Sequence, residues 1–201
     1  PMVIGTFIMV ATYSLFYIMT AFAQAYSRTP ATLSEAGYPM GLGIPANTFT
    51  GLLLMSAIVF AIFISISGLY ADKIGRRKWL IWTTVSILIF ALCMPLFLGN
   101  GTPTSVFAFL VIGMALMGMT FGPMAALLPE LFPTEVRYSG ASLAYNIASI
   151  IGATIAAMIS LKINALYGLM GVGIYLAINA FLTLLALLAS KETKNVDLTQ
   201  I

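Results

Sequence analysis

Residues 68–78 read GLYADKIGRRK, and this charged stretch separates two long segments without ionisable side chains. The preceding segment, 36–71, and the following segment, 79–129, contain no Lys, Arg, Asp, Glu or His. About 20 consecutive apolar residues suffice for a helix to cross the hydrocarbon layer of a bilayer, so each segment can hold one or two crossings. A charged turn between such segments predicts that the chain leaves a membrane and re-enters it here.

The composition of the whole chain supports this interpretation. Hydrophobic residues make up 61% of the sequence and charged residues 7%, against roughly 45–50% and about 25% in soluble domains. We therefore expect an all-α polytopic membrane protein, with a helical bundle over 1–190 and a cytoplasmic tail over 191–201. Dividing the apolar segments at Gly, Pro and Asn predicts six transmembrane helices, near 3–26, 48–70, 79–98, 104–128, 139–161 and 169–189.

The distribution of basic residues predicts the orientation. Short loops on the cytoplasmic side retain Lys and Arg during membrane insertion. The connections on one side carry Lys73, Arg76, Arg77, Lys78, Arg137, Lys191 and Lys194, whereas the alternating connections carry only Arg28 and Lys162. Both ends of the chain are thus expected in the cytoplasm. The same bias explains the net charge of +3, and we expect no nucleic-acid partner.

The turn at 68–78 also has a specific residue pattern. Gly68 permits close helix approach, Gly75 can adopt positive φ, and Asp72 can cap a helix N-terminus. A positively charged turn without further function is the simpler interpretation. The spacing, however, resembles the G-x-L-A-D-K/R-x-G-R-R/K signature of the major facilitator superfamily, which lies between the second and third helices of each half.

A second string, LPELFPTEVRYSGAS at 128–142, occupies the next cytoplasmic connection. It resembles the P-E-L-F-P-T-x-V-R-Y-[ST]-G-A-S motif of the metabolite:proton symporter group, which includes permeases for proline and betaine, 2-oxoglutarate and shikimate. The resemblance extends along the chain and matches the C-terminal half of such a transporter. It implies one half, a 3+3 inverted repeat, of a major facilitator fold in the cell membrane. The start at Pro1 rather than Met also suggests a fragment.

The resemblance implies a function as well. It predicts a secondary active transporter that moves a small polar metabolite, an organic acid or a zwitterion, by proton symport and alternating access. The expected partners are the lipid bilayer, that metabolite and an N-terminal six-helix half of the same transporter. A non-transporting sensor, or a channel-like oligomer of six-span subunits, is the alternative.

Charged residues of the two motifs form a candidate gating network at the cytoplasmic side. Its members are Asp72, Arg76, Arg77, Glu130 and Arg137. We hypothesise that they hold one conformation and rearrange when the bundle moves. The alternative is a set of solvated charges that contribute about 0–1 kcal/mol per pair.

Uncharged polar residues inside the predicted helices are candidates for lining a substrate cavity. In the first helix, Tyr13, Tyr17, Thr20 and Gln24 share a face because they recur every three or four residues. In the fifth, Asn146 and Ser149 are candidates, since an amide both donates and accepts hydrogen bonds. Hydrogen bonding between helices is an equal alternative for Asn146. In the sixth, peripheral by resemblance, Asn179 and Thr183 are expected to serve packing.

Asp, Glu, Lys, Arg and His are absent from the interior of every predicted helix. Because such a residue is the usual marker of a proton path, we expect the proton-coupling residue in the other half. Pro123 is expected to kink the fourth helix. The lone Cys93, the absence of His and the lack of any phosphate-binding or catalytic motif predict no metal site, no cofactor besides the coupling proton, and no enzyme activity.

Overall fold

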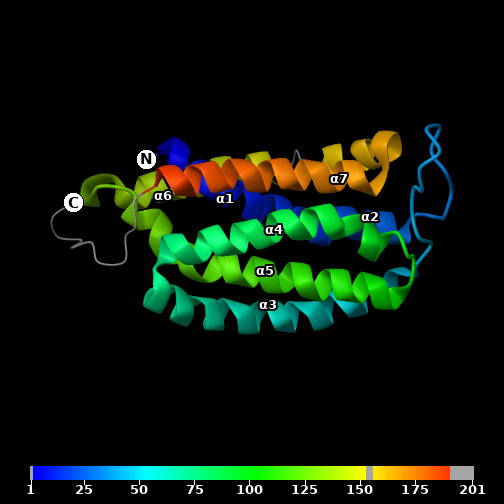
Figure 1. Ribbon diagram of the computed structural model, residues 1–201, viewed down its shortest axis with the longest axis horizontal. Coiled ribbons are helices and arrows are strands. Elements are labelled where there is room, and N and C mark those ends of the chain that lie inside the picture. Colours follow the sequence, from blue (N-terminus) through cyan, green and yellow to red (C-terminus); the bar gives the residue numbers. More distant parts are fainter. Residues whose placement is uncertain (1, 153–155, 191–201) are drawn as a thin grey trace.

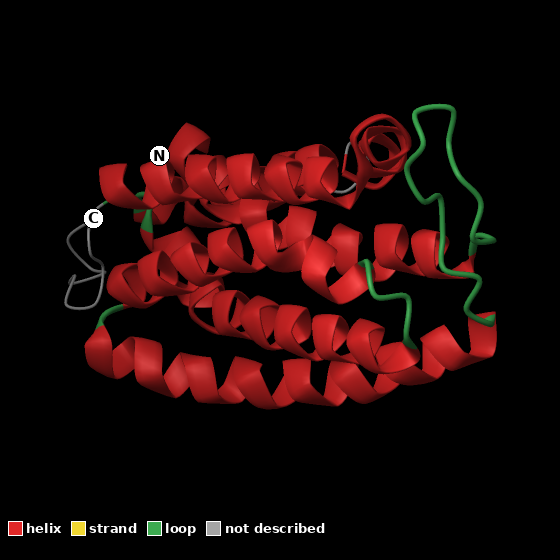
Figure 2. Cartoon of the chain, turned by 45° about the vertical axis from the view of Figure 1, so that its right-hand side comes forward, coloured by secondary structure: helices red, strands yellow, loops and turns green. Residues whose placement is uncertain are grey.

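The computed structural model describes residues 2–152 and 156–190, and in these ranges the chain is helical apart from its connections, of which the loop 29–45 is the most extended (Figures 1 and 2). The expected tail over 191–201 lies outside the described residues. The elements are α1 (Met2–Tyr17), the π-helix η1 (Ile18–Phe22), α2 (Ala23–Arg28), α3 (Ala46–Ile74), α4 (Arg76–Leu98), α5 (Pro103–Glu130), the 3-10 helix η2 (Thr134–Val136), α6 (Arg137–Ile150) and α7 (Ala156–Ala189).

The long helices run side by side, so the connections gather at two ends (Figure 1). One end holds the start of α1, the α3–α4 turn, the α5–α6 connection and the end of α7. This end carries the basic residues of both motifs and is called the basic end below. The opposite end holds the 29–45 loop and the α4–α5 connection. The alternation of charge expected from the sequence is therefore present in space.

Single residues set the ends of several helices. Gly75 has φ 112° and alone separates α3 from α4, a conformation that side chains with a Cβ rarely adopt. At the start of α5, Thr102 caps the helix by accepting a hydrogen bond from the Ser105 amide at 3.2 Å, and Pro103 follows as the first helical residue.

The sixth predicted helix, 169–189, begins where expected, whereas the fifth, 139–161, is divided between α6 and the first part of α7. Five helices in the described ranges are long and apolar enough to cross a membrane, counting α1 to α2 as one. The short α6 is not among them, and α7 spans 34 residues. Within α7, Gly168 has φ 69° and ψ −172°, so the backbone breaks there. The stretch 169–189 runs back toward the basic end (Figure 1), which gives α7 two successive helical parts.

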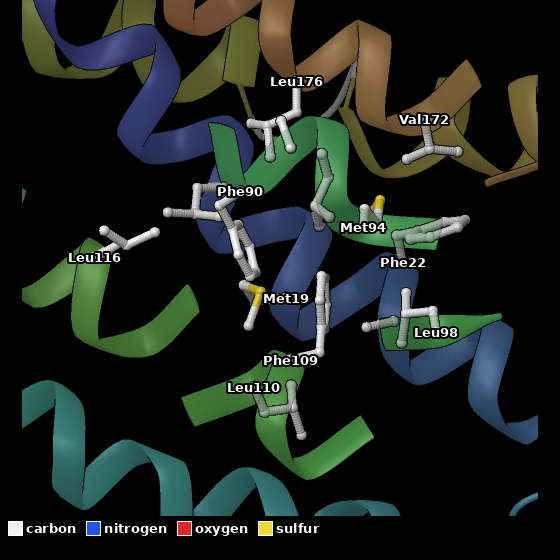
Figure 3. Close-up of a cluster of buried hydrophobic side chains, with 14 of the residues drawn as sticks. Met19, Phe22, Phe90, Met94, Leu98, Phe109, Leu110, Leu116, Val172 and Leu176 are labelled. Atoms are coloured by element: carbon white, nitrogen blue, oxygen red, sulfur yellow. The ribbon is translucent and has the colours of Figure 1, made fainter. Parts of the chain in front are cut away.

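The main core lies where α1, η1, α4, α5 and α7 meet. Figure 3 shows large buried side chains from these elements pointing toward one another, among them Met19, Phe22, Phe90, Phe109 and Leu176. Phe90 and Phe109 stack with ring centroids 5.1 Å apart. A smaller apolar cluster at the basic end joins α1, α5 and α6 through residues such as Ile8, Leu128 and Ala144.

The outer helix α3 packs chiefly on α5 and is otherwise exposed. Only 11% of the most apolar 18-residue stretch of α3 is buried, compared with 61% of the corresponding stretch within Met2–Arg28. Its contact with α5 depends on glycine: a Cβ on Gly122 would lie 2.1 Å from Ser67 Oγ, and one on Gly118 would lie 2.7 Å from the Phe60 carbonyl oxygen. Ser67 Oγ also donates to the Gly118 carbonyl at 3.0 Å. This glycine seam lets the two backbones nearly touch.

The contact between α1 and the second part of α7 is polar. Thr183 Oγ1 donates to the Phe7 carbonyl at 2.6 Å and accepts from the Ala11 amide at 3.1 Å. One turn earlier in α7, Asn179 Nδ2 donates to Ser14 Oγ at 3.0 Å. The packing role expected for Asn179 and Thr183 is thus observed. We call this contact the polar seam.

Candidate functional site

The basic end brings α3, α4 and α5 together through one arginine. Arg76, the first residue of α4, donates from Nε to Asp72 Oδ1 at 3.1 Å and from Nη1 to Glu130 Oε1. The Asp72 side chain is 63% exposed, whereas that of Glu130 is only 12% exposed. Exposed pairs contribute little, so the link between α4 and the end of α5 is the stronger of the two.

Only one of the two carboxylate oxygens of Glu130, Oε1, accepts a hydrogen bond from the described residues. Its Oε2 atom is buried and makes no hydrogen bond to the described residues. A shielded carboxylate that loses its cation is costly, because the remaining charge is left without solvent or a partner. Arg76 therefore determines whether the end of α5 can stay at its present position.

The neighbouring residue, Arg77, contacts a different helix. Its Nε donates to the Leu187 carbonyl at 2.7 Å and its Nη2 to the Leu188 carbonyl at 2.9 Å. These carbonyls lie in the last turn of α7, where the usual i+4 amide donors run out, so the guanidinium acts as a C-terminal cap. The Leu187 carbonyl also accepts from the Ser190 amide at 3.3 Å and the Ser190 hydroxyl at 2.8 Å. Arg77, predicted as a member of the charge network, thus ties the start of α4 to the end of α7.

Arg137 lies at the same end but is not ion-paired to a described carboxylate. Its Nε donates to the Phe132 carbonyl at 3.4 Å and its Nη2 to Thr134 Oγ1 at 3.2 Å. The tight turn through Thr134–Val136 places these acceptors directly before α6. The structure therefore joins Asp72, Arg76 and Glu130, and leaves Arg137 on a local turn.

The predicted stripe of the first helix is half-buried along its length. Tyr13, Tyr17, Thr20 and Gln24 all show intermediate exposure. Thr20 Oγ1 donates to the Phe16 carbonyl at 2.7 Å. The hydroxyls of Tyr13 and Tyr17 and the Gln24 amide make no hydrogen bond to the described residues, so they can bond to a solute or water.

The α6 candidates lie beside this stripe. A Cβ on Gly152, just beyond α6, would lie 2.4 Å from Tyr13 Cβ, which shows how closely the two chain segments approach. Asn146 is exposed and donates from Nδ2 to the Ser142 carbonyl at 2.8 Å, while Ser149 is half-buried. The Asn146 bond is within its own helix, so the amide joins no neighbouring helix in the described residues.

Pro123 lies inside α5, which continues as one helix from Pro103 to Glu130. Proline cannot donate the usual i→i−4 hydrogen bond, so the Met119 carbonyl lacks its helical donor and accepts instead from Trp79 Nε1 at 3.0 Å. The kink expected there stays a prediction.

Two features of the structure were missed from the sequence. The π-helix Ile18–Phe22 places Thr20 in a widened turn, a feature common at functional sites, and no residue pattern indicated it. Trp79 stacks on Tyr70 at 5.9 Å and donates from Nε1 to the Met119 carbonyl at 3.0 Å. An aromatic pair flanking the charged turn was the available signal.

The described residues contain no cluster of three or more His, Cys, Asp or Glu side chains that could hold a metal ion. The basic end instead offers ion pairs, helix caps and hydrogen-bonding groups. Such an arrangement can hold or release helix ends, and the stripes on α1 and α6 can contact a polar solute. Neither provides a nucleophile with an adjacent base.

Comparisons with known proteins identify the class. The family model described as "Sugar (and other) transporter" matches residues 40–201. A Haemophilus influenzae protein named "Putative metabolite transport protein" is 87% identical over 100% of this chain, and the Escherichia coli inner membrane metabolite transport protein YhjE is 52% identical over 98%. A proline/betaine transporter of Salmonella typhimurium is 32% identical over 72%.

The chain spans about half the length of the curated relatives it matches, with 46% of the H. influenzae protein and 43% of YhjE covered. No solved structure matches it. These relatives carry the names of transport proteins, which agrees with the expectation that the chain is not an enzyme.

Proposed function

The chain belongs to the sugar (and other) transporter family of the major facilitator superfamily, and on this premise we propose that it forms the C-terminal half of a proton-coupled metabolite symporter. In this proposal the half lies in the cell membrane with both ends in the cytoplasm. Together with an N-terminal six-helix half it moves a small polar metabolite, an organic acid or a zwitterion, by alternating access.

The observation that carries the proposal is the pair of adjacent polar stripes on α1 and α6. A polar stripe on a helix in lipid is favourable only if it faces protein or an aqueous cavity. The Tyr13 and Tyr17 hydroxyls and the outward Asn146 amide have no interhelical bond in the described residues, unlike the polar residues of the seam between α1 and α7. We infer that they face a cavity shared with the other half.

In this proposal, the ion pairs at the basic end control a movement of the last turns of α5. Glu130 ends α5, two turns after Pro123, and Arg76 holds it against the start of α4. Because the glycine seam fixes α5 to α3 up to Gly122, motion at this end is confined to the turns beyond it. Release of Glu130 from Arg76 would let those turns bend and open the cytoplasmic side.

Proton coupling is assigned to the absent half. The candidate membrane helices carry Asp or Glu only at the basic end, as Asp72 and Glu130, within the described residues. Both are engaged by Arg76, which stays protonated at all accessible pH values. A carboxylate held in this way is a poor proton carrier.

Transport is tested with the intact protein in liposomes under an inward proton gradient. Proline, glycine betaine and 2-oxoglutarate are offered as solutes, and an uncoupler serves as the control. Uptake that needs the gradient supports the proposal, whereas gradient-independent leakage of all three solutes contradicts it. Asn146→Leu should raise KM about tenfold, because one lost polar contact is worth about 1–2 kcal/mol. Asn100→Leu at the opposite end, which lies in the α4–α5 connection and donates to the Leu96 carbonyl at the end of α4, should leave KM unchanged.

A double-mutant cycle on Arg76 and Glu130 tests whether their ion pair holds the end of α5. Arg76→Gln should impair transport and folding more than the pair of changes together, because it leaves a shielded carboxylate alone. After allowance for partial exposure, we expect a coupling of about 1–2 kcal/mol. Strictly additive effects of the two changes would show that the ion pair does not hold the end of α5.

A further inference from the structure

A groove at the basic end has the chemistry of an anion site. It encloses about 480 Å³ between the end of α5, η2 and the first turns of α6. Its lining consists of Pro129, Thr134, Arg137, Tyr138, Ala141, Ser142 and Tyr145. The combination of one guanidinium and four hydroxyls contains donors and a cation but no carboxylate.

The guanidinium in this groove is fixed in place. Arg137 uses Nε and Nη2 for the Phe132 carbonyl and Thr134 Oγ1, and its Nη1 has no hydrogen-bond partner among the described residues. Arginine presents five donors in a rigid fork. The two local bonds therefore orient the remaining donors without neutralising the charge.

Hydroxyl donors surround the same space. Tyr138, Ser142 and Tyr145 lie one turn apart along α6, and none of their hydroxyls makes a hydrogen bond within the described part of the chain. The nearest carboxylates in sequence, Glu130 and Glu135, do not line the groove, and Glu130 is already paired with Arg76. A cation without a neighbouring anion favours an anionic ligand.

We propose that this groove binds the carboxylate or phosphate group of an anionic ligand through Arg137, with Tyr138, Ser142 and Tyr145 as hydroxyl donors. Charge-assisted hydrogen bonds to a guanidinium are about twice as strong as neutral ones. The hydroxyl series continues along α6 to Ser149, so the groove lies at the basic-end mouth of the proposed cavity. The ligand is either a free anion approaching that mouth or the head group of an anionic phospholipid.

Phenylglyoxal labelling of arginine, read by peptide mass spectrometry, tests the site in the intact protein. One arm uses phosphatidylcholine liposomes with and without inorganic phosphate. The other uses phosphatidylglycerol liposomes without phosphate. An occupied groove should slow labelling of Arg137 about tenfold, which corresponds to about 1.4 kcal/mol of protection, while exposed Arg28 at the opposite end is labelled at an unchanged rate. Protection by phosphate identifies a free anion, and protection by phosphatidylglycerol alone identifies a lipid.

Matched serine variants locate the ligand. Ser142→Ala should weaken the protection of Arg137 severalfold, whereas Ser139→Ala, on an exposed residue of the same helix outside the groove, should not. Absence of protection in both arms overturns the proposal, as does equal protection of Arg28, which would indicate general charge screening. The labelling requires no transported solute, so a failed transport assay and a failed groove are distinguishable.

Discussion

The glycine seam between α3 and α5 and the polar seam between α1 and α7 hold helices together by different means. In the glycine seam, Gly118 and Gly122 remove side chains so that backbones approach, and one hydroxyl, Ser67 Oγ, crosses the contact. In the polar seam, ordinary side chains keep the helices apart while Thr183 and Asn179 bridge them. Lipid gives little hydrophobic drive for helix association, so close packing and hydrogen bonds are the available forces.

The difference predicts how each seam fails. Close packing fails steeply, since any added atom meets backbone that cannot move away cheaply. Interhelical hydrogen bonds fail gradually, because each contributes only about 0.6 kcal/mol on average in a membrane. The glycine seam also borders the part of α5 that we propose to move.

The largest effect is expected for Gly122→Ala. The new Cβ would lie 2.1 Å from Ser67 Oγ and 2.6 Å from the Ile64 carbonyl oxygen, so α3 and α5 must separate. We expect a loss of about 3 kcal/mol in the free energy of unfolding, measured by detergent-induced denaturation of the intact protein. Gly113→Ala, whose Cβ meets only the flexible side chain of Met19, should cost clearly less. Equal losses at both positions would show that the close backbone contact is not what matters.

A smaller effect is expected for Thr183→Val, which keeps the shape and removes the hydroxyl. The change deletes the bonds to the Phe7 carbonyl and the Ala11 amide, and we expect a loss of about 1–1.5 kcal/mol. Thr183→Ser keeps the hydroxyl and should retain most of that stability in the same denaturation assay. If serine is as damaging as valine, the methyl group contributes as much to the contact as the hydroxyl.

A loss of only about 0.6 kcal/mol is expected for Asn179→Leu, the average for one interhelical hydrogen bond in a membrane. The change removes the bond to Ser14 Oγ and preserves the side-chain volume. Combined with Thr183→Val, the losses should be nearly additive, since the two residues contact different groups on α1. A combined loss well below the sum would indicate that the polar seam acts as one cooperative unit.

A small effect of opposite sign is expected for Gly51→Ala in α3. A Cβ there would meet nothing within 4 Å, and alanine is favoured over glycine in a helix by about 0.5–1 kcal/mol. Unfolding of the intact protein should therefore become slightly harder. A marked loss instead would show that the other half packs on Gly51, which would make it a second glycine seam between the halves.

Much of this fold could be predicted from the sequence, because membrane crossing is a property of local composition. The long apolar segments correspond to the run from α1 to α2 and to α3, α4 and α5, with ends close to those expected, and the basic residues gathered at one end. The expected start of the last helix at 169 coincides with the backbone break at Gly168, whereas the helix expected over 139–161 is divided between α6 and the first part of α7. A Cβ on Gly168 would lie 2.6 Å from the Tyr38 ring, and its φ of 69° also favours glycine.

Within the candidate site, only the contacts between oppositely charged side chains could be predicted from the sequence. Asp72, Arg76 and Glu130 come together as opposite charges in neighbouring turns would suggest. The acceptors of Arg77 and Arg137 are mainly backbone carbonyls, of Leu187, Leu188 and Phe132, which carry no mark in the sequence. A guanidinium that caps a helix end therefore cannot be told in advance from one that pairs with a carboxylate.

The cap that Arg77 places on α7 also has a consequence for biosynthesis. Arg77 and Leu187 are 110 positions apart, so the ribosome must make α5, α6 and nearly all of α7 before these acceptors exist. At about 5–20 residues per second, the interval is roughly 5–20 s. During that time the first turn of α4 lacks its tie to the last helix, and the insertion machinery holds a bundle whose basic end is still incomplete. Closure of that end is thus timed by the arrival of the final helix.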